Sequence, residues 1–173
     1  MGGLAWRRWI SPRRSEALTK ASALDTAVRF LAQRPRSEYE VRRRLRRAGV
    51  DEATLEGVLE QLRRHQLVDD RAFAEYWVEQ RQTHRPRGAR LVRAELTRLG
   101  VERSRAEAVT APLQGSAAAD AYRAAARHAA RLRTLDEATF RSRLGQWLAR
   151  RGFDWDTITT VVQRLWSEAE PSA

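Results

Sequence analysis

The chain has 173 residues, no cysteine and a formal net charge of +11. Without cysteine it forms neither disulfides nor thiolate metal sites. No apolar run reaches the ~18 residues that a membrane span needs, so we expect no membrane partner. A cationic excess of this size favours a polyanionic partner. Lys20 is the only lysine among 33 basic residues, so arginine carries nearly all of the positive charge.

Residues 1–16 are basic and aromatic, as in the run Trp6-Arg7-Arg8-Trp9. No apolar segment follows them to form a secretory or twin-arginine leader. We expect a flexible tail here, with an ordered interaction segment as the alternative. We expect a second, disordered tail at residues 169–173.

The first repeat, residues 17–66, begins with an apolar stripe at helical spacing. The stripe consists of Ala23, Leu24, Ala27, Val28 and Leu31. Ser37 and Glu40 then predict a capping box at the start of a second helix. Gly49 is placed to end that helix in a left-handed conformation, and Asp51 is placed to cap the next one.

The pattern around Gly49 recurs around Gly100 and Gly152, which follow at intervals of 51 and 52 residues. Matching apolar residues lie eight and four positions before each glycine, and an acidic residue lies two positions after it. The apolar residues are Val41, Val92 and Leu144, then Leu45, Leu96 and Leu148, and the acids are Asp51, Glu102 and Asp154. We interpret the chain as an internal triplication, in which each unit is a helix, a tight turn and a helix, preceded by a third helix.

The second repeat, residues 67–115, starts with Asp69 and Asp70, which we expect to be the N-cap and the first-turn anion of a helix. That helix carries a part-aromatic stripe of Phe73, Tyr76, Trp77 and Gln80. The tripeptide Arg85-Pro86-Arg87 repeats Arg34-Pro35-Arg36 of the first repeat, and Gly88 then stands where the first repeat has Ser37. Pro112 is expected to stop a helix and to leave Leu113 in a connection.

The third repeat, residues 116–168, opens with an alanine-rich stretch at residues 117–132 that supplies its first helix. We interpret the aromatic residues as core rather than as stacking platforms for bases, with Trp147, Phe153 and Trp155 packed at the turn. No run of alternating β-branched residues supports a sheet. The sequence therefore predicts an all-α protein of three tandem three-helix repeats, stacked into an elongated, curved body.

The arginines gather near the repeated turns, and we interpret them as candidate binding residues for the polyanion. They are Arg42, Arg43, Arg46 and Arg47 in the first repeat, Arg85, Arg87, Arg90, Arg93 and Arg98 in the second, and Arg150 and Arg151 in the third. In the first repeat, like charges four residues apart repel, and Glu38 and Glu40 relieve only part of the repulsion, so an external anion is expected. For Arg47, Arg98 and Arg150, two positions before each glycine, the helix dipole is an alternative explanation.

No pattern in the chain predicts catalysis. The three histidines are far apart, and no phosphate-binding glycine motif is present. Asp69 and Asp70 are better explained as a helix cap than as an acid–base pair. We expect neither an enzyme nor a metal or other cofactor.

The segment LVDDRAFAEYWVEQR, residues 67–81, resembles the most distinctive stretch of the RecX family of bacterial recombination regulators. Residues 32–50 resemble the first motif of the same family, and Leu148 to Phe153 resemble its third. Its second motif is matched by Gly88, Leu91, Glu95-Leu96 and Leu99-Gly100-Val101. The resemblance runs from about residue 24 to residue 165 and is loose only at Gln146-Trp147 and in the alanine-rich stretch.

The resemblance implies a non-enzymatic modulator, mainly an inhibitor, of the RecA recombinase. Members of the family bind RecA and DNA, and they restrain filament growth, ATP hydrolysis and strand exchange. The implied partners are the RecA filament and single- and double-stranded DNA, held through their phosphates without sequence preference. We expect a cytoplasmic monomer.

Two other classes of protein stay open at this point. One is a DNA-binding transcriptional regulator of helix-turn-helix type, although the basic helix of the first repeat offers no asparagine or glutamine to read adenine. The other is a helical scaffold whose charge serves solubility. Salt separates them, because binding to phosphates weakens steeply as salt rises.

Overall fold

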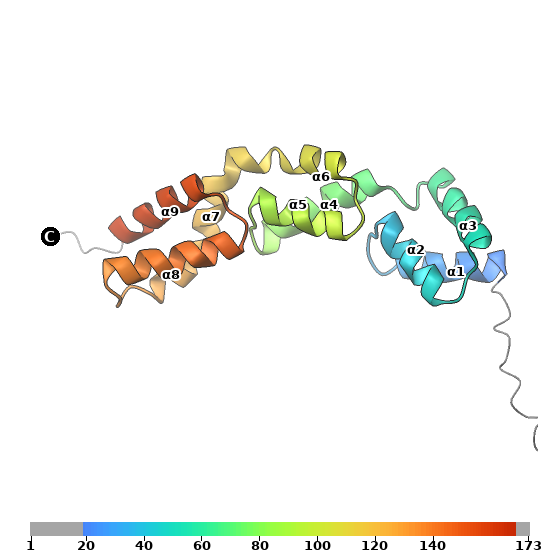
Figure 1. The fold of residues 1–173 in the computed structure, drawn as a ribbon, viewed down its shortest axis with the longest axis horizontal. Helices are drawn as coiled ribbons and strands as arrows, with labels where there is room; N and C mark the ends of the chain where they lie inside the picture. Colours follow the sequence, from blue (N-terminus) through green and yellow to red (C-terminus); the bar gives the residue numbers. More distant parts are fainter. Residues whose placement is uncertain (1–18, 169–173) are drawn as a thin grey trace, which may run out of the picture. The chain divides into compact units, whose positions relative to one another are not determined.

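The computed structural model describes residues 19–168, and within that range it contains nine α-helices and no strand (Figure 1). The all-α prediction is confirmed for this part of the chain. The two tails expected at residues 1–16 and 169–173 lie outside the described residues. The chain forms two compact units, which divide between Asp69 and Asp70.

The first unit is a three-helix bundle of α1 (Lys20–Leu31), α2 (Glu38–Arg47) and α3 (Glu52–Arg64), each packed on the other two. Its core comprises Ala23, Ala27, Val41, Leu45, Val50, Leu55, Val58, Leu59, Leu62 and Val68. The expected stripe of α1 is only partly buried, because Val28 is 42% exposed. The predicted capping box is present: the Oγ of Ser37 accepts from the backbone N of Glu40 at 3.2 Å, and Glu40 Oε2 accepts from the backbone N of Ser37 at 3.3 Å.

The second unit contains two further bundles. The first consists of α4 (Asp70–His84), α5 (Ala89–Arg98) and α6 (Arg103–Thr110), and the second of α7 (Leu113–Ala130), α8 (Glu137–Arg150) and α9 (Trp155–Ser167). The core of α4–α6 is built on Phe73, Val92 and Leu96. The core of α7–α9 is built on Phe140, Leu144 and Leu148. Each bundle therefore has its own apolar centre, as expected of a repeat protein.

The three repeated turns have the geometry that the sequence predicts. Gly49, Gly100 and Gly152 have φ angles of 82°, 86° and 85°, a region that suits glycine because it lacks a Cβ. The acids that follow them cap the next helices: Asp51 begins α3, Glu102 begins α6 and Asp154 begins α9. A left-handed glycine followed by a capping acid is thus the joint inside each repeat.

The prediction for Leu113 is wrong. Pro112 lies beyond the end of α6, as expected, but it is also the N-cap of α7, and Leu113 is the first residue of that helix. Proline is tolerated at the start of a helix because the N–H that it lacks has no partner there. The Leu113 side chain is buried in the core of α4–α6, so the first turn of α7 belongs to the packing of the preceding bundle. The position at which we expected the second and third repeats to join, residues 115–116, lies inside α7.

The aromatic residues differ in how deeply they are buried. Phe73 and Phe153 are 2% and 3% exposed, so the prediction of core positions is confirmed for them. It is wrong for Trp155, which is 77% exposed as the first residue of α9. Trp77 and Trp147 are partly buried, and each carries an arginine guanidinium against its ring, at 4.1 Å for Arg81 and 4.0 Å for Arg151.

Candidate anion-binding site

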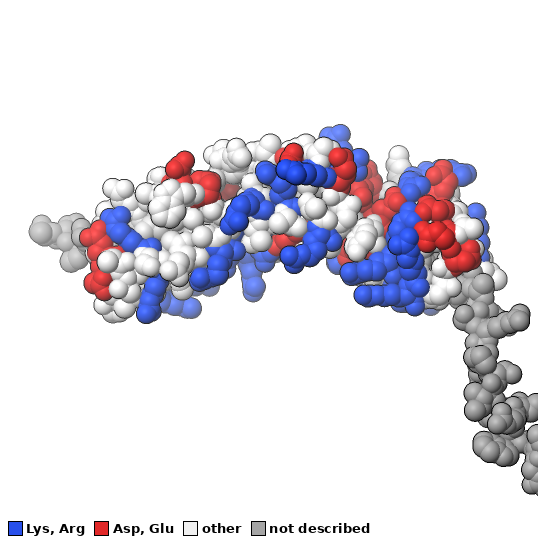
Figure 2. Space-filling model, in the orientation of Figure 1, with Lys and Arg blue, Asp and Glu red and all other residues white. Residues whose placement is uncertain are grey.

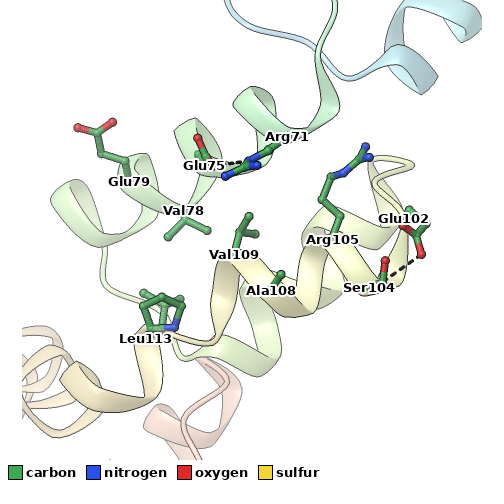
Figure 3. A pocket seen from close by; sticks show the side chains of 11 residues that line it. Arg71, Glu75, Val78, Glu79, Glu102, Ser104, Arg105, Ala108, Val109 and Leu113 are labelled. Atoms are coloured by element: carbon green, nitrogen blue, oxygen red, sulfur yellow. Dashed lines mark hydrogen bonds and ion pairs between the residues drawn. The ribbon is translucent and has the colours of Figure 1, made fainter.

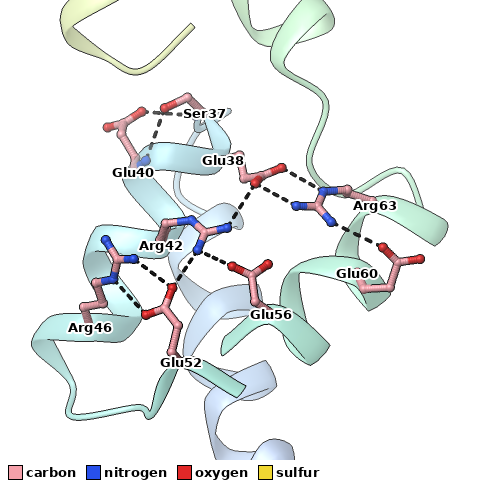
Figure 4. A network of polar contacts seen from close by, with 9 residues as sticks. All are labelled: Ser37, Glu38, Glu40, Arg42, Arg46, Glu52, Glu56, Glu60 and Arg63. Atoms are coloured by element: carbon pink, nitrogen blue, oxygen red, sulfur yellow. Dashed lines mark hydrogen bonds and ion pairs between the residues drawn. The ribbon is translucent and has the colours of Figure 1, made fainter. Parts of the chain in front are cut away.

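The basic helix α2 has some of its arginines neutralised within the first unit. Arg42 forms ion pairs with Glu38 at 3.5 Å, with Glu52 at 2.9 Å and with Glu56, and Arg46 pairs with Glu52 at 2.8 Å (Figure 4). The hydrogen bond from Arg42 to Glu56 raises the pKa of Arg42. Glu52 and Glu56 lie on α3, so these cations find their counter-charge across the helix pair.

The same network continues on the other side of Glu38. Arg63, near the end of α3, donates two hydrogen bonds of 2.8 Å to this carboxylate and also pairs with Glu60 at 3.3 Å (Figure 4). The hydrogen bond from Arg63 lowers the pKa of Glu38. On the face of the first unit visible in Figure 2, basic and acidic side chains accordingly lie in adjacent bands.

Arg43 and Arg47 differ from their two neighbours. Both side chains are exposed and neither forms an ion pair with another described residue. Arg43 lies 5.9 Å from the ring centroid of Tyr39, a loose contact that leaves the guanidinium accessible. Of the four arginines that we selected on this helix, two are therefore held by α3 and two are available to a partner.

In the second unit, too, some of the selected arginines contact other residues and others do not. Arg90 donates to the backbone carbonyl of Ala149 at 3.0 Å, and Arg93 makes a long contact of 3.4 Å with the Oγ1 of Thr110. Arg98 is exposed without an ion pair to any residue in the range 19–168. Arg90 thus tethers α5 to the end of α8, rather than pointing freely to solvent.

Four selected arginines from two different repeats surround one cavity of about 270 Å³. The cavity is lined by Arg85, Arg87, Leu91, Trp147, Arg150 and Arg151, and we refer to it as the junction cavity. Arg85 and Arg87 precede α5, whereas Arg150 and Arg151 end α8. None of the six lining residues is acidic, so the cavity is a concave site of one sign of charge.

Two side chains of the junction cavity are fixed by contacts behind it. Arg87 pairs with Glu95, which also accepts from the Nε of Arg81 at 2.7 Å and from the Nε1 of Trp77 at 2.9 Å. The Cζ of Arg151 lies 4.0 Å from the centroid of the Trp147 ring, and that indole in turn stacks with His128 at 4.9 Å between centroids. Our sequence reasoning missed Glu95, Trp77 and Trp147 as supports, because no local pattern links them to these arginines.

The arginines of the junction cavity are close enough for their charges to lower one another's pKa values. Burial lowers the pKa of Arg151, and the charge of Arg85 lowers it further. Burial likewise lowers the pKa of Arg87, with added contributions from the charges of Arg81, Arg151 and Arg85. Cations from two repeats thus repel one another at this cavity, and an anion bound there would reduce the repulsion.

Two glycines bring the two sides of the junction cavity together. The backbone N of Gly88, the N-cap of α5, donates to the carbonyl of Arg151 at 2.9 Å. A Cβ on Gly88 would lie 2.1 Å from the carbonyl oxygen of Gly152, and a Cβ on Gly152 would lie 2.4 Å from the Cβ of Leu91. Only glycine allows the backbones to approach this closely. This explains why position 88 is a glycine, whereas the first repeat has Ser37 at the matching position.

A larger hollow of about 820 Å³ lies between α4 and α6. Val78, Ala108 and Val109 form an apolar part of its wall, and Arg71 and Glu75 pair at its edge at 3.0 Å (Figure 3). Arg105, Glu79 and Glu102 also line it. Charges of both signs are mixed here, so this hollow does not select an anion.

The fold defines a class, the all-α proteins built from tandem three-helix repeats. Three segments match, in order, the family descriptions "RecX, first three-helix domain" at residues 23–62, "RecX, second three-helix domain" at residues 69–109 and "RecX, third three-helix domain" at residues 118–162. The chain belongs to the RecX family. No helix among residues 19–168 combines the length and the apolar character needed to cross a bilayer.

Curated relatives and solved structures agree with this assignment. The chain is 34% identical over 147 residues to "Regulatory protein RecX" of Chlorobium limicola, which covers 85% of this chain and 91% of that protein. It is 38% identical over 141 residues to the protein of the same name from Geobacillus thermodenitrificans, of which it covers only 52%. The crystal structure of RecX from Lactobacillus salivarius superposes with a TM-score of 0.72 at 21% identity, over 84% of this chain and 96% of that one, which shows a shared fold.

Proposed function

We propose that this protein regulates a RecA recombinase by binding the RecA–DNA filament and restraining its growth, its ATP hydrolysis and strand exchange. The observation that carries the proposal is the match of all three repeats to RecX, together with relatives named as regulatory proteins. We further propose that the protein acts without catalysis, as a monomer in the cytoplasm.

The available arginines support the choice of an anionic partner. Arg43 and Arg47 on α2, and Arg85, Arg150 and Arg151 at the junction cavity, form no ion pair within the described part of the chain. A guanidinium binds carboxylate and phosphate in the same two-pronged way, so it suits both an acidic recombinase surface and a DNA backbone. Several weak contacts made by linked repeats add to a strong one, because after the first contact the others form within one complex.

The mechanism that we propose is steric and electrostatic. Repeats that contact neighbouring recombinase subunits either block addition of the next subunit or hold the filament in a state that does not cycle. Either route lowers the ATPase activity of the filament at amounts of this protein well below those of the recombinase.

The test is the single-strand-dependent ATPase of the cognate recombinase, measured with sub-stoichiometric amounts of this protein. We expect the wild-type chain to suppress the activity, and the double variant Arg43→Glu/Arg47→Glu to lose suppression while its helical circular dichroism is unchanged. The matched control is Arg29→Glu/Arg64→Glu, which makes the same change of net charge at side chains that are 80% and 73% exposed. Absence of suppression by the wild-type chain would overturn the proposed function, and full suppression by the Arg43/Arg47 variant would remove α2 from it.

A further inference from the structure

The tripeptide Arg-Pro-Arg occurs in the first and second repeats, but its surroundings differ. In the first repeat, Arg34 and Arg36 bind the buried carboxylate of Glu40 at 2.7 and 3.3 Å. The position equivalent to Glu40 in the second repeat is Leu91, 51 residues later, and Leu91 lines the junction cavity. The second tripeptide therefore has no counterpart of the carboxylate that neutralises the first.

Only one of the two arginines of the second tripeptide finds another acidic partner inside the second repeat. Arg87 takes Glu95 as its partner, whereas Arg85 remains exposed and without an ion pair among residues 19–168. Docking of the third repeat then adds Arg150 and Arg151 to the same cavity rather than an acid. Like charges therefore gather near the position at which the first repeat has a carboxylate, and an anion from outside would reduce their mutual repulsion.

We propose that the junction cavity binds a phosphate group of a nucleic-acid strand, with Arg85, Arg150 and Arg151 as its ligands and Arg87 as a supporting cation. This inference rests on the proposed function, because it names the DNA component that this surface would hold. Its position between two repeats also makes it a site that neither repeat contains alone.

Phosphate fits the cavity better than a carboxylate does. A carboxylate is planar with two oxygens, so it accepts hydrogen bonds best from donors that lie near one plane. The phosphate of a DNA backbone offers its oxygens in more than one plane, so it can accept from forks that arrive from both α5 and α8. A cavity of about 270 Å³ is also large enough for one phosphate group.

The site is partly organised before the anion arrives. The contact with the Trp147 ring restrains Arg151, and the ion pair with Glu95 restrains Arg87. Side chains that are already oriented lose less conformational freedom on binding, which favours affinity. Binding should also stabilise the junction itself, because the anion has ligands on both repeats and favours the docked state over the undocked one.

The test uses fluorescence anisotropy with a fluorescein-labelled single-stranded oligothymidine, with the full-length chain titrated at several salt concentrations. For Arg85→Gln/Arg150→Gln we expect roughly tenfold or greater weakening, and a log–log salt slope lower by about one for each phosphate that the variant no longer binds. Neither side chain has an ion pair within the described residues, and their replacement relieves repulsion between cations, so the variant should melt no lower than the wild type. The matched control is Arg103→Gln/Arg141→Gln, exposed arginines of the same unit that each pair with a glutamate four positions away; it should bind as the wild type does. Equal affinity of the Arg85/Arg150 variant and the control would overturn the inference.

Competition identifies the source of the anion. We expect unlabelled single-stranded or duplex DNA to displace the labelled strand, and poly-glutamate to displace it poorly at the same charge concentration. Displacement by poly-glutamate as effective as that by DNA would overturn the assignment to phosphate. Sodium phosphate that raises the melting temperature of the wild type but not of the Arg85/Arg150 variant, without any loss of DNA affinity in that variant, would show a site for free phosphate and overturn the assignment to nucleic acid.

The recombinase ATPase assay keeps this inference separate from the proposed function. If the Arg85/Arg150 variant loses DNA binding but still suppresses the ATPase, the junction cavity is confirmed as a DNA site that suppression does not require. If the wild-type chain binds DNA through the cavity but never suppresses the ATPase, the proposed function fails and the cavity assignment stands.

Discussion

Gly88 and Gly152 lie so close together that a Cβ on Gly88 would come within 2.1 Å of the carbonyl oxygen of Gly152. The two residues belong to different repeats, and each also has a role at the end of a helix in its own repeat. Gly88 is the N-cap of α5, and Gly152 provides the left-handed turn between α8 and α9. Their contact places the start of α5 against the end of α8, and the junction cavity is a consequence of that contact.

The close approach predicts that Gly88→Ala weakens the docking of the third repeat on the second. The added methyl group meets backbone atoms, which move less readily than a side chain, so we expect a loss of about 1–3 kcal/mol in unfolding free energy. Denaturant unfolding of the full chain measures it. Gly115→Ala is the control, since nothing lies within 4 Å of its Cβ and alanine favours the helix α7 by up to about 1 kcal/mol. Equal stability of the Gly88 and Gly115 variants would contradict the role of the contact.

The ion pair between Glu38 and Arg63 predicts a dependence on acid. Because the folded-state pKa of Glu38 is lowered from 4.5, its contribution is present above pH 4.5 and is lost as the pH falls below that value. At neutral pH we expect Glu38→Gln to cost at most about 1 kcal/mol, since the side chains of Glu38 and Arg63 are 26% and 41% exposed. Unfolding curves between pH 5.5 and pH 3 should fall less steeply for this variant than for the wild type. A variant with the same acid dependence as the wild type would exclude Glu38 as the responsible group.

His128 predicts a second dependence of stability on pH, which arises from an imidazole rather than from a carboxylate. Burial lowers its pKa below 6.5, and the charges of Arg131, Arg151 and Arg150 lower it further. The unfolded state therefore binds a proton more readily than the folded state does, so stability should fall as the pH drops below about 6.5, until the folded-state pKa is passed. Imidazole proton shifts measured by NMR against pH should give a midpoint below 6.5. The variant His128→Gln should lose this part of the pH dependence, while exposed His65→Gln should keep it.

The exposure of Trp155 predicts a contrast between two aromatic residues of the third repeat. Trp155→Ala should change the unfolding free energy by less than about 0.5 kcal/mol, as is usual for a surface position. Phe140→Ala should cost about 3–5 kcal/mol, because that ring is fully buried in the core of α7–α9. Denaturant titration compares the two directly. A large loss with Trp155→Ala would restore the core position that the sequence had led us to expect.

Local patterns were sufficient to predict most of the fold. The spacing of apolar residues about Gly49, Gly100 and Gly152, and the acids that follow them, predicts three joints that the structure confirms. These features act within one or two helical turns, so they can be read along the chain. Leu113 shows the limit of prediction from local patterns. Its helix begins immediately after Pro112, but its side chain is buried in the core of the preceding bundle.

The candidate site was predictable only as a set of residues. All four arginines of the junction cavity were selected from the sequence, along with Arg42, Arg46, Arg90 and Arg93, which turn out to contact other parts of the protein. The sequence alone determined the repeat, the helices, their caps and the cationic excess, because these depend on neighbours in the chain. Tertiary structure decided which cations are neutralised and which converge, because the partners of an arginine, such as Glu52 for Arg46 or Ala149 for Arg90, come from other helices.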